Sequence, residues 1–389
     1  MSWPICGRYT AKVSEHMSRR TFELWVWGLV VSSLLLSGSW RTVSAHRTGF
    51  LPHAISLADL DHDGQLDMVV PASASRQVTV LLGDGNGGVK ATQTYPAGKG
   101  PTWVETADFN GDGHIDVLAT NTGSASLTLY FGDGQGALTN RRDVEGIHGP
   151  ASAVAADFDR DGHQDVAVAL AAKSEVMILR NRGGGELDQL RTYTVGRGPH
   201  ILSKADVNRD HQPDLVVGCL GTHALSILLS KGNGTFHEVV DVPVGRFPHY
   251  RSFGDWNGDG YPDAAVVVAG DDAVDILIGN GAGELKKTVS YPVGTNPHGL
   301  DAGDFNEDGH ADLAVSNRSS RDIHLLMGDG TGAFVSQAPL MTGQDIIALA
   351  VGDFNADAHA DLALVSATSN TVILWRGDGT GAFTPFVAP

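Results

Sequence analysis

Seven acidic nonapeptides are the residues of this chain whose types and spacing could do chemistry. Each follows the pattern D-x-[DN]-x-D-G-x-x-D, except that two copies replace the glycine. The pattern places side-chain oxygens at positions 1, 3, 5 and 9, a backbone carbonyl at position 7 and a sharp bend at position 6. Hard oxygen donors in a short flexible loop select Ca²⁺ over transition metals. The copies begin 49 residues apart, at Asp59, Asp108, Asp157, Asp206, Asp255, Asp304 and Asp353.

The candidate calcium ligands occupy the same five positions in every loop, with position 7 contributing its backbone carbonyl. The fourth and seventh loops carry His211 and Ala358 at the bend, where a left-handed conformation costs a side chain about 1 kcal/mol or more. We therefore expect up to seven bound Ca²⁺ ions, held most weakly in those two loops. By loop, the ligands are Asp59, Asp61, Asp63, Gln65 and Asp67; Asp108, Asn110, Asp112, His114 and Asp116; Asp157, Asp159, Asp161, His163 and Asp165; Asp206, Asn208, Asp210, Gln212 and Asp214; Asp255, Asn257, Asp259, Tyr261 and Asp263; Asp304, Asn306, Asp308, His310 and Asp312; and Asp353, Asn355, Asp357, His359 and Asp361.

An acidic turn without metal is the alternative interpretation of these loops, because Asp and Asn also stabilise turns through their own backbone. Charge argues against that alternative. Residues 46–389 hold 22 Lys and Arg against 43 Asp and Glu, a net charge of −21. Like charges about 4 Å apart repel by about 4 kcal/mol at an intermediate dielectric, so a cation between the carboxylates is favoured. The same charge repels nucleic acid and anionic membranes.

Four histidines form a second group of candidate ligands. His53, His200, His249 and His298 each stand six residues ahead of the first aspartate of a loop. The last three come from consecutive repeats and could bind zinc or copper, or could act with Arg246, Tyr250 and Arg251 on a carboxylate or sugar. The alternative is structural, with proline fixing a turn and histidine bonding a neighbouring carbonyl.

Short strands must position all of these residues, because runs of Val, Ile, Leu and Ala alternate with Gly, Asp and Asn clusters and no window resembles a helix. In the second repeat we expect strands A to D at 103–107, 117–120, 126–131 and 138–144. The acidic loop then joins A to B, and a glycine-rich hairpin joins C to D. That hairpin glycine recurs at Gly85, Gly134, Gly183, Gly232, Gly281, Gly330 and Gly379, as a turn with positive φ requires.

A seven-bladed β-propeller, all-β and built of four-stranded antiparallel blades, is the predicted fold. A unit of about 50 residues cannot bury both faces of its sheet alone, and repetition lets each sheet pack on the next around a ring. Blades of 49 residues should start near residues 47, 96, 145, 194, 243, 292 and 341. Whole blades at both ends or an exchanged closing strand would each close the ring.

The first 45 residues have the layout of an export signal, with a possible upstream extension over residues 1–16. Arg19 and Arg20 precede an apolar run at 24–36, and 43–45 is a small-residue cleavage site. Both the general secretory and the twin-arginine routes fit. The run is too short to span a bilayer, so we expect no membrane insertion of the mature chain. Cys219 is alone after residue 45, which excludes a disulfide within the mature chain.

The sequence resembles the FG-GAP or VCBS repeat, the blade of integrin-α-like propellers. The resemblance rests on DFNGDGHIDVLATN and the following LTLYFGDGQGAL, and it covers about residues 47–389. It implies that the acidic loop joins strands A and B and binds calcium. The family includes adhesion modules, ligand-binding modules and parts of enzymes, so the fold alone does not give a function.

Two functions remain as hypotheses. The leading one is an exported monomeric binding or adhesion module in the periplasm, outside the cell or on its surface, with calcium on one face and a protein or carbohydrate partner on the other. The rival is a propeller enzyme, a lyase or hydrolase, whose metal is held by His200, His249 and His298 on the face opposite the acidic loops.

Overall fold

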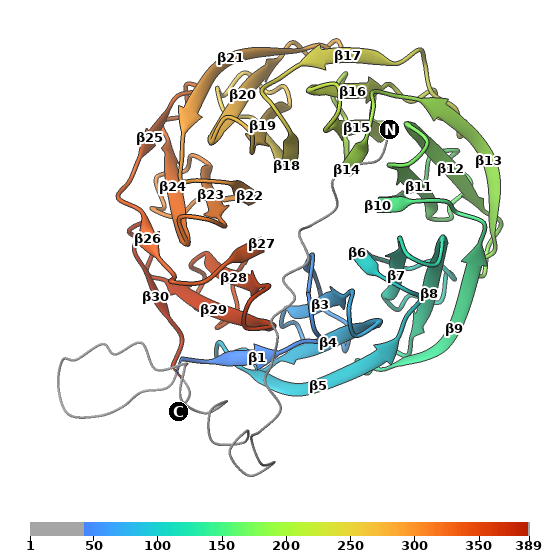
Figure 1. Ribbon diagram of the computed structural model, residues 1–389, viewed down its shortest axis with the longest axis horizontal. Helices are drawn as coiled ribbons and strands as arrows, with labels where there is room; N and C mark the ends of the chain where they lie inside the picture. The colour runs from blue at the N-terminus through green and yellow to red at the C-terminus, as the bar shows by residue number, and fades with distance from the viewer. Residues whose placement is uncertain (1–42, 388–389) are drawn as a thin grey trace, which may run out of the picture. The chain divides into compact units, whose positions relative to one another are not determined.

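A ring of seven β-sheets makes up residues 43–387, the part of the chain that the computed structural model describes (Figure 1). Each sheet is a blade of antiparallel strands, and no helix occurs in these residues. The predicted seven-bladed propeller is confirmed. Blades one to three contain β2 (Ser56–Ala58), β3 (Asp67–Ala72), β4 (Gln77–Gly83) and β5 (Val89–Pro96); β6 (Pro101–Ala107), β7 (Asp116–Asn121), β8 (Ser126–Gly132) and β9 (Leu138–Glu145); and β10 (Pro150–Ala156), β11 (Asp165–Leu170), β12 (Glu175–Asn181) and β13 (Leu187–Thr194).

The remaining blades follow the same order, with the outermost strand broken in the last two. Blades four and five contain β14 (Pro199–Ala205), β15 (Asp214–Cys219), β16 (Ala224–Leu228) and β17 (Val240–Pro243); and β18 (Pro248–Gly254), β19 (Asp263–Val268), β20 (Ala273–Gly279) and β21 (Leu285–Pro292). Blade six contains β22 (Pro297–Gly303), β23 (Asp312–Asn317), β24 (Asp322–Gly328), β25 (Phe334–Ser336) and β26 (Leu340–Met341). Blade seven contains β27 (Ile346–Gly352), β28 (Asp361–Ser366), β29 (Thr371–Gly377), β30 (Phe383–Pro385) and β1 (Ala45–Arg47).

The strands predicted for the second repeat are β6 to β9, each longer than expected by one or two residues at an end. Burial explains their composition. Every residue of β7 is buried, as in a strand covered on both faces, so neither face is exposed to solvent. In β9 only Leu138 is buried and the other residues are exposed or half-buried, as expected for the outer strand of a blade.

The hydrophobic core is divided into seven clusters, each shared by two neighbouring blades. Position 2 of the acidic loop contributes an aromatic anchor to several of them. Phe109 of the second loop packs with Val166 and Leu179 of the third blade, and it is 1% exposed. A single blade therefore has no complete core of its own.

A backbone hydrogen bond links hairpin and acidic loop of neighbouring blades. The second glycine of a C–D hairpin donates to the carbonyl of position 2 in the preceding blade, as Gly332 does to Trp256 at 2.7 Å and Gly381 to Phe305 at 2.7 Å. Gly87 of the first blade donates to Phe354 of the seventh at 2.8 Å, so the same bond closes the ring.

Both ends of the described chain complete the seventh blade, which resolves how the ring closes. β30 pairs with β29 through Phe383 and Gly377, and β1 pairs with the other half of β29 through Ala45 and Ile373. Blade six is built alike from β25 and β26. An N-terminal strand therefore takes the place of a missing strand end, and the first repeat begins its own blade only after β1.

The export-signal prediction lies mostly outside the described residues, since residues 1–42 and 388–389 are not described. Within residues 43–387, Cys219 is a buried free cysteine. The described residues include no helix long and apolar enough to cross a membrane.

Candidate metal centres

The acidic loops hold their carboxylates in place through their own backbone. In the second loop, the amides of Asp112 and Gly113 donate to the two oxygens of Asp108 at 3.2 and 2.9 Å, and His114 donates to Asp112 at 2.9 Å. The same amide at position 6 bonds the carboxylate at position 1 in all seven loops. The loops are therefore preorganised around the candidate ligand oxygens.

The bend at position 6 has the left-handed conformation that the sequence predicted. The glycines there have φ between +81° and +88°, while His211 and Ala358 adopt +62° and +69°. Those two side chains therefore carry the expected backbone strain. Position 4 is left-handed as well, including Arg160 at +63° and Glu307 at +58°, which the sequence pattern did not predict because non-glycine residues are common there.

Position 9 is buried beneath each loop. In the sixth blade, Asp312 accepts the amide of Phe305 at 2.9 Å and that of Gly328 at 2.7 Å, and it is 0% exposed. Each oxygen keeps a lone pair for a metal after accepting one amide. Burial, the largest cause, raises the pKa of all seven of these carboxyls, to about 6 for five of them. The five are Asp67, Asp116, Asp165, Asp214 and Asp361, and the other two are Asp263 and Asp312.

The oxygen donors of these loops fit a calcium ion. Within residues 43–387, ligand atoms of Asp59, Asp61 and Asp63 lie within 4.8 Å of one another. The third loop brings Asp157, Asp159 and Asp165 together in the same way. Asp61 Oδ1 is buried without a hydrogen-bond partner, which leaves its lone pairs available to a cation. Side-chain oxygens at this separation can share one ion at 2.3–2.6 Å.

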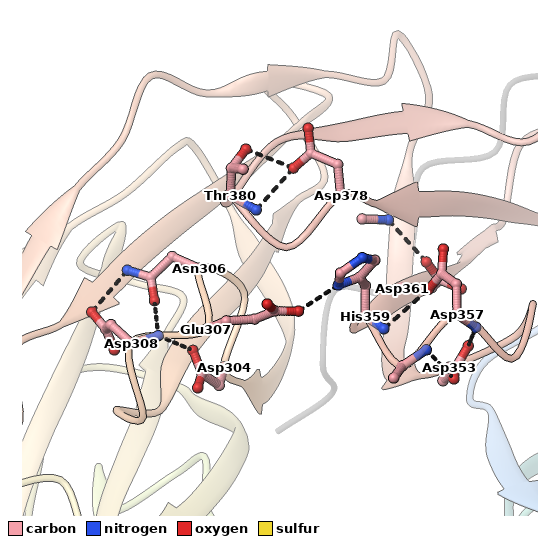
Figure 2. A network of polar contacts seen from close by, with 12 residues as sticks. Asp304, Asn306, Glu307, Asp308, Asp353, Asp357, His359, Asp361, Asp378 and Thr380 are labelled. Atoms are coloured by element: carbon pink, nitrogen blue, oxygen red, sulfur yellow. Dashed lines mark hydrogen bonds and ion pairs between the residues drawn. The ribbon is translucent and has the colours of Figure 1, made fainter.

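Neighbouring loops contact each other through positions 4 and 7. The Arg160 Nε atom donates to Gln212 at 2.6 Å, and the guanidinium of Arg209 lies 5.4 Å from the ring centre of Tyr261. His62 and His114 interact in the same register, as do Glu307 and His359 (Figure 2). Position 7 therefore contributes a side chain to the loop interface, besides the carbonyl assigned to it from the sequence. The sequence signal for this contact is a long polar residue at position 4, which these loops have and the others replace with glycine or alanine.

The histidines of consecutive blades do converge on the innermost strands. The ring centres of His200 and His249 are 5.2 Å apart, and those of His249 and His298 are 4.5 Å apart. The Nδ1 atoms of His200 and His249 are buried without a hydrogen-bond partner, whereas His298 Nδ1 lies 2.6 Å from the carbonyl of Ile347. His53 instead bonds Ser73 at 3.0 Å.

Desolvation lowers the pKa of His200, His249 and His298 to about 3, with smaller contributions from neighbouring positive groups, so all three are neutral at physiological pH. Their ring nitrogens do not, however, form a group within 4.8 Å among residues 43–387. A shared metal ion would require side-chain rotation.

The proposed grouping of Arg246, Tyr250 and Arg251 does not form. Arg251 is 6% exposed and donates to the backbone carbonyls of Ile201 and Val216, and the exposed Arg246 pairs with Asp271 at 2.7 Å. The Tyr250 hydroxyl donates to the carbonyl of His53 at 3.4 Å, 197 positions away in the sequence. These three side chains bond separate partners and do not converge on one ligand.

Comparison with protein families gives one match. The model of the FG-GAP-like repeat matches residues 59–119, 108–168, 206–266, 255–315 and 304–364, which together cover more than half of the chain. No curated protein matches the sequence.

Solved structures of low identity share the fold. A lectin of Agrocybe aegerita that recognises non-reducing terminal N-acetylglucosamine has a TM-score of 0.55 and 18% identity over 89% of this chain and 90% of its own. Virginiamycin B lyase of Staphylococcus aureus has a TM-score of 0.58 and 10% identity over 86% and 98%. A protein from Lactobacillus plantarum has a TM-score of 0.61 and 16% identity over 88% and 95%. At these identities the likeness concerns the fold alone.

Proposed function

This chain belongs to the FG-GAP-like repeat family, and on that premise we propose that it is an exported calcium-stabilised propeller that binds a protein or carbohydrate partner. The observation that carries the calcium part is the convergence of aspartates in the acidic loops, with one oxygen of Asp61 buried and unpaired. Up to seven Ca²⁺ ions would offset most of the charge of −21 left after residue 45. Calcium would then take the stabilising role of disulfides, since Cys219 is the one cysteine after residue 45.

The face opposite the acidic loops is the proposed partner surface. Its D–A loops expose large apolar side chains, with Phe50 at 68%, Leu51 at 51% and Phe247 at 48%. Exposed apolar groups on loops held by a rigid scaffold are typical of binding surfaces. A lectin and a lyase both have this fold, so the fold does not choose between binding and catalysis.

Glycan and surface-protein arrays test the binding function with the calcium-loaded mature chain. Phe50→Ser and Phe247→Ser should each weaken capture of any bound partner, while the matched substitution Val335→Ser on the outer strand β25, 62% exposed in the native chain, should leave capture unchanged. Capture that is unaffected by both Phe variants would place the partner elsewhere.

A propeller enzyme of the lyase or hydrolase class remains the second candidate, because three neutral histidines meet in the channel. His298 Nδ1 bonds a carbonyl and leaves Nε2 free, which is how metal-binding histidines are usually oriented. In this function a zinc or copper ion held by His200, His249 and His298 would supply the Lewis acid.

Elemental analysis of the purified mature chain separates the two candidates. Calcium without zinc or copper supports the binding module. About one equivalent of zinc or copper, lost in His249→Ala while calcium remains, supports the enzyme. His53→Ala is the control, because this histidine bonds Ser73 and lies outside the trio.

A further inference from the structure

Two basic side chains occupy acidic loops of their own blades. Lys90 of β5 extends into the first loop, where its Nζ atom lies 2.6 Å from Asp61 Oδ2 and also bonds Asp63. Arg180 of β12 does the same in the third loop, with Nε at 2.8 Å from Asp159 and Nη2 at 3.0 Å from Asp161. Each cation therefore holds the carboxylates at positions 3 and 5, which are candidate ligands of calcium.

These are the two loops that carry Asp at position 3. The other five carry Asn there, and its amide donates to the carboxylate at position 5, as Asn306 does to Asp308 at 2.9 Å (Figure 2). The same bond occurs in the second, fourth, fifth and seventh loops. A side-chain cation is therefore present where the extra carboxylate is present, and the loop's own amide replaces it elsewhere.

The chain contains a matched reference for each cation. Lys286 occupies the position of Lys90 in the fifth blade, four repeats later, and Arg376 occupies the position of Arg180 in the seventh. Neither forms an ion pair with its loop within the described residues 43–387. Their loops have Asn257 and Asn355 at position 3. A basic residue at this register is thus not sufficient to form the ion pair. The ion pair also requires the fourth aspartate of the loop.

Charge counts over the four side-chain ligand positions agree with this relationship. The first and third loops have four aspartates and one bound cation, a net of −3, and the other five have three aspartates, also −3. Calcium and an ammonium group compete for the same oxygens, because the ion needs them at 2.3–2.6 Å and repels a second cation there.

We propose that Lys90 and Arg180 are tethered counter-ions that hold the first and third loops closed without calcium and are displaced when calcium binds. This inference rests on the proposed calcium function. The Lys90 side chain is 32% exposed, so its ammonium can move into water when displaced. The competition lowers the calcium affinity of these loops by about fivefold, since the ion must select the fraction of molecules in which the cation has left.

Hydrogen–deuterium exchange of the full mature chain across buffered free-calcium concentrations tests the proposal loop by loop. Lys90→Met keeps the aliphatic stem and removes the charge, and it should lower the calcium midpoint for protection of residues 59–67 by about fivefold. Arg180→Leu, which introduces the residue found at this register in Leu82 and Leu229, should do the same for residues 157–165. Lys286→Met and Arg376→Leu should leave residues 255–263 and 353–361 unchanged.

The same variants separate this role from a merely structural one. In chelator, Lys90→Met should increase hydrogen exchange in the first loop, because the carboxylates lose their counter-ion. At free calcium near the native midpoint it should decrease exchange, because calcium then occupies the loop in more of the molecules. Asn257→Asp should lead Lys286 to pair with the fifth loop. In that background, Lys286→Met should lower the calcium midpoint for protection of the fifth loop. An unchanged or raised calcium midpoint in Lys90→Met would overturn the inference alone. Loops that gain no protection from calcium in any variant would overturn the calcium function as well.

Discussion

Glu307 of the sixth acidic loop and His359 of the seventh form a hydrogen-bonded ion pair across the boundary between two blades (Figure 2). The hydrogen bond that His359 donates to the Glu307 carboxylate is the largest cause of a raised pKa at His359. This pair is one of four contacts between positions 4 and 7 that connect neighbouring loops. The contacts connect the first loop with the second, the third with the fourth, the fourth with the fifth, and the sixth with the seventh.

Replacing Glu307 with Gln should lower the pKa of His359 towards its ordinary value of 6.5. In the native chain the pair stabilises the fold below about pH 6.5, and this contribution is lost as pH rises through the raised pKa of the folded state. Titration of histidine resonances by NMR measures the shift. His310 is the internal reference, because position 4 of the loop before it is Gly258, and a His359 pKa that does not change would contradict the pairing.

The buried position 9 carboxylate should matter for stability even without metal. Asp312→Ala removes the acceptor of two amides, those of Phe305 and Gly328, and each orphaned donor costs about 1–3 kcal/mol. In chelator we expect a loss of about 3 kcal/mol or more in the free energy of unfolding, measured by denaturant titration. Asp304→Ala, at the half-buried position 1 of the same loop, should cost less, because the amides of the exposed Asp308 and Gly309 that it accepts can bond water instead. Equal losses of unfolding free energy for the two variants in chelator would contradict a stabilising role of Asp312 that is independent of calcium.

Hairpin glycines should be required for close approach as well as for their φ. A Cβ on Gly134 would lie 2.3 Å from the ring of His114, whereas one on Gly146 would have no neighbour within 4 Å, and both residues have positive φ. Gly146→Ala should therefore cost about 1–2 kcal/mol from backbone strain alone, and Gly134→Ala clearly more. Adding His114→Ala to Gly134→Ala should return the cost to that of Gly146→Ala. No recovery in the double variant would exclude the steric explanation.

Acid should destabilise the propeller through its channel histidines. His200, His249 and His298 stay neutral in the folded chain down to about pH 3, while the unfolded chain binds protons below about pH 6.5. The unfolded state therefore gains protons first, and the free energy of unfolding falls as pH drops from about 6.5 towards 3. His249→Phe should make this fall shallower in denaturant titrations at several pH values, and an unaltered slope would contradict it.

The repeat spacing made the fold predictable, because seven copies at a constant interval leave no room for other architectures, and runs such as Val117 to Thr120 identify the buried strands. The strain at His211 and Ala358 was predictable from a single missing glycine. Ring closure was not, since β1 carries only three residues and no repeat motif.

Contacts between an outer strand and the acidic loop of its own blade were also beyond the sequence. Lys90 and Asp61 are 29 positions apart, and nothing in one repeat indicates that a strand residue enters its loop until the blades with Asp at position 3 are compared. The convergence of His200, His249 and His298 was predicted because they share one register, but the ring orientations depend on packing around Tyr250.

Thermal unfolding of the mature chain in calcium and in excess chelator tests the central claim most directly. The account predicts a melting temperature many degrees lower in chelator, restored by adding calcium back and scarcely changed by magnesium, which is smaller and requires near-octahedral ligands at about 2.0–2.1 Å. The same melting temperature in calcium and in chelator would contradict it.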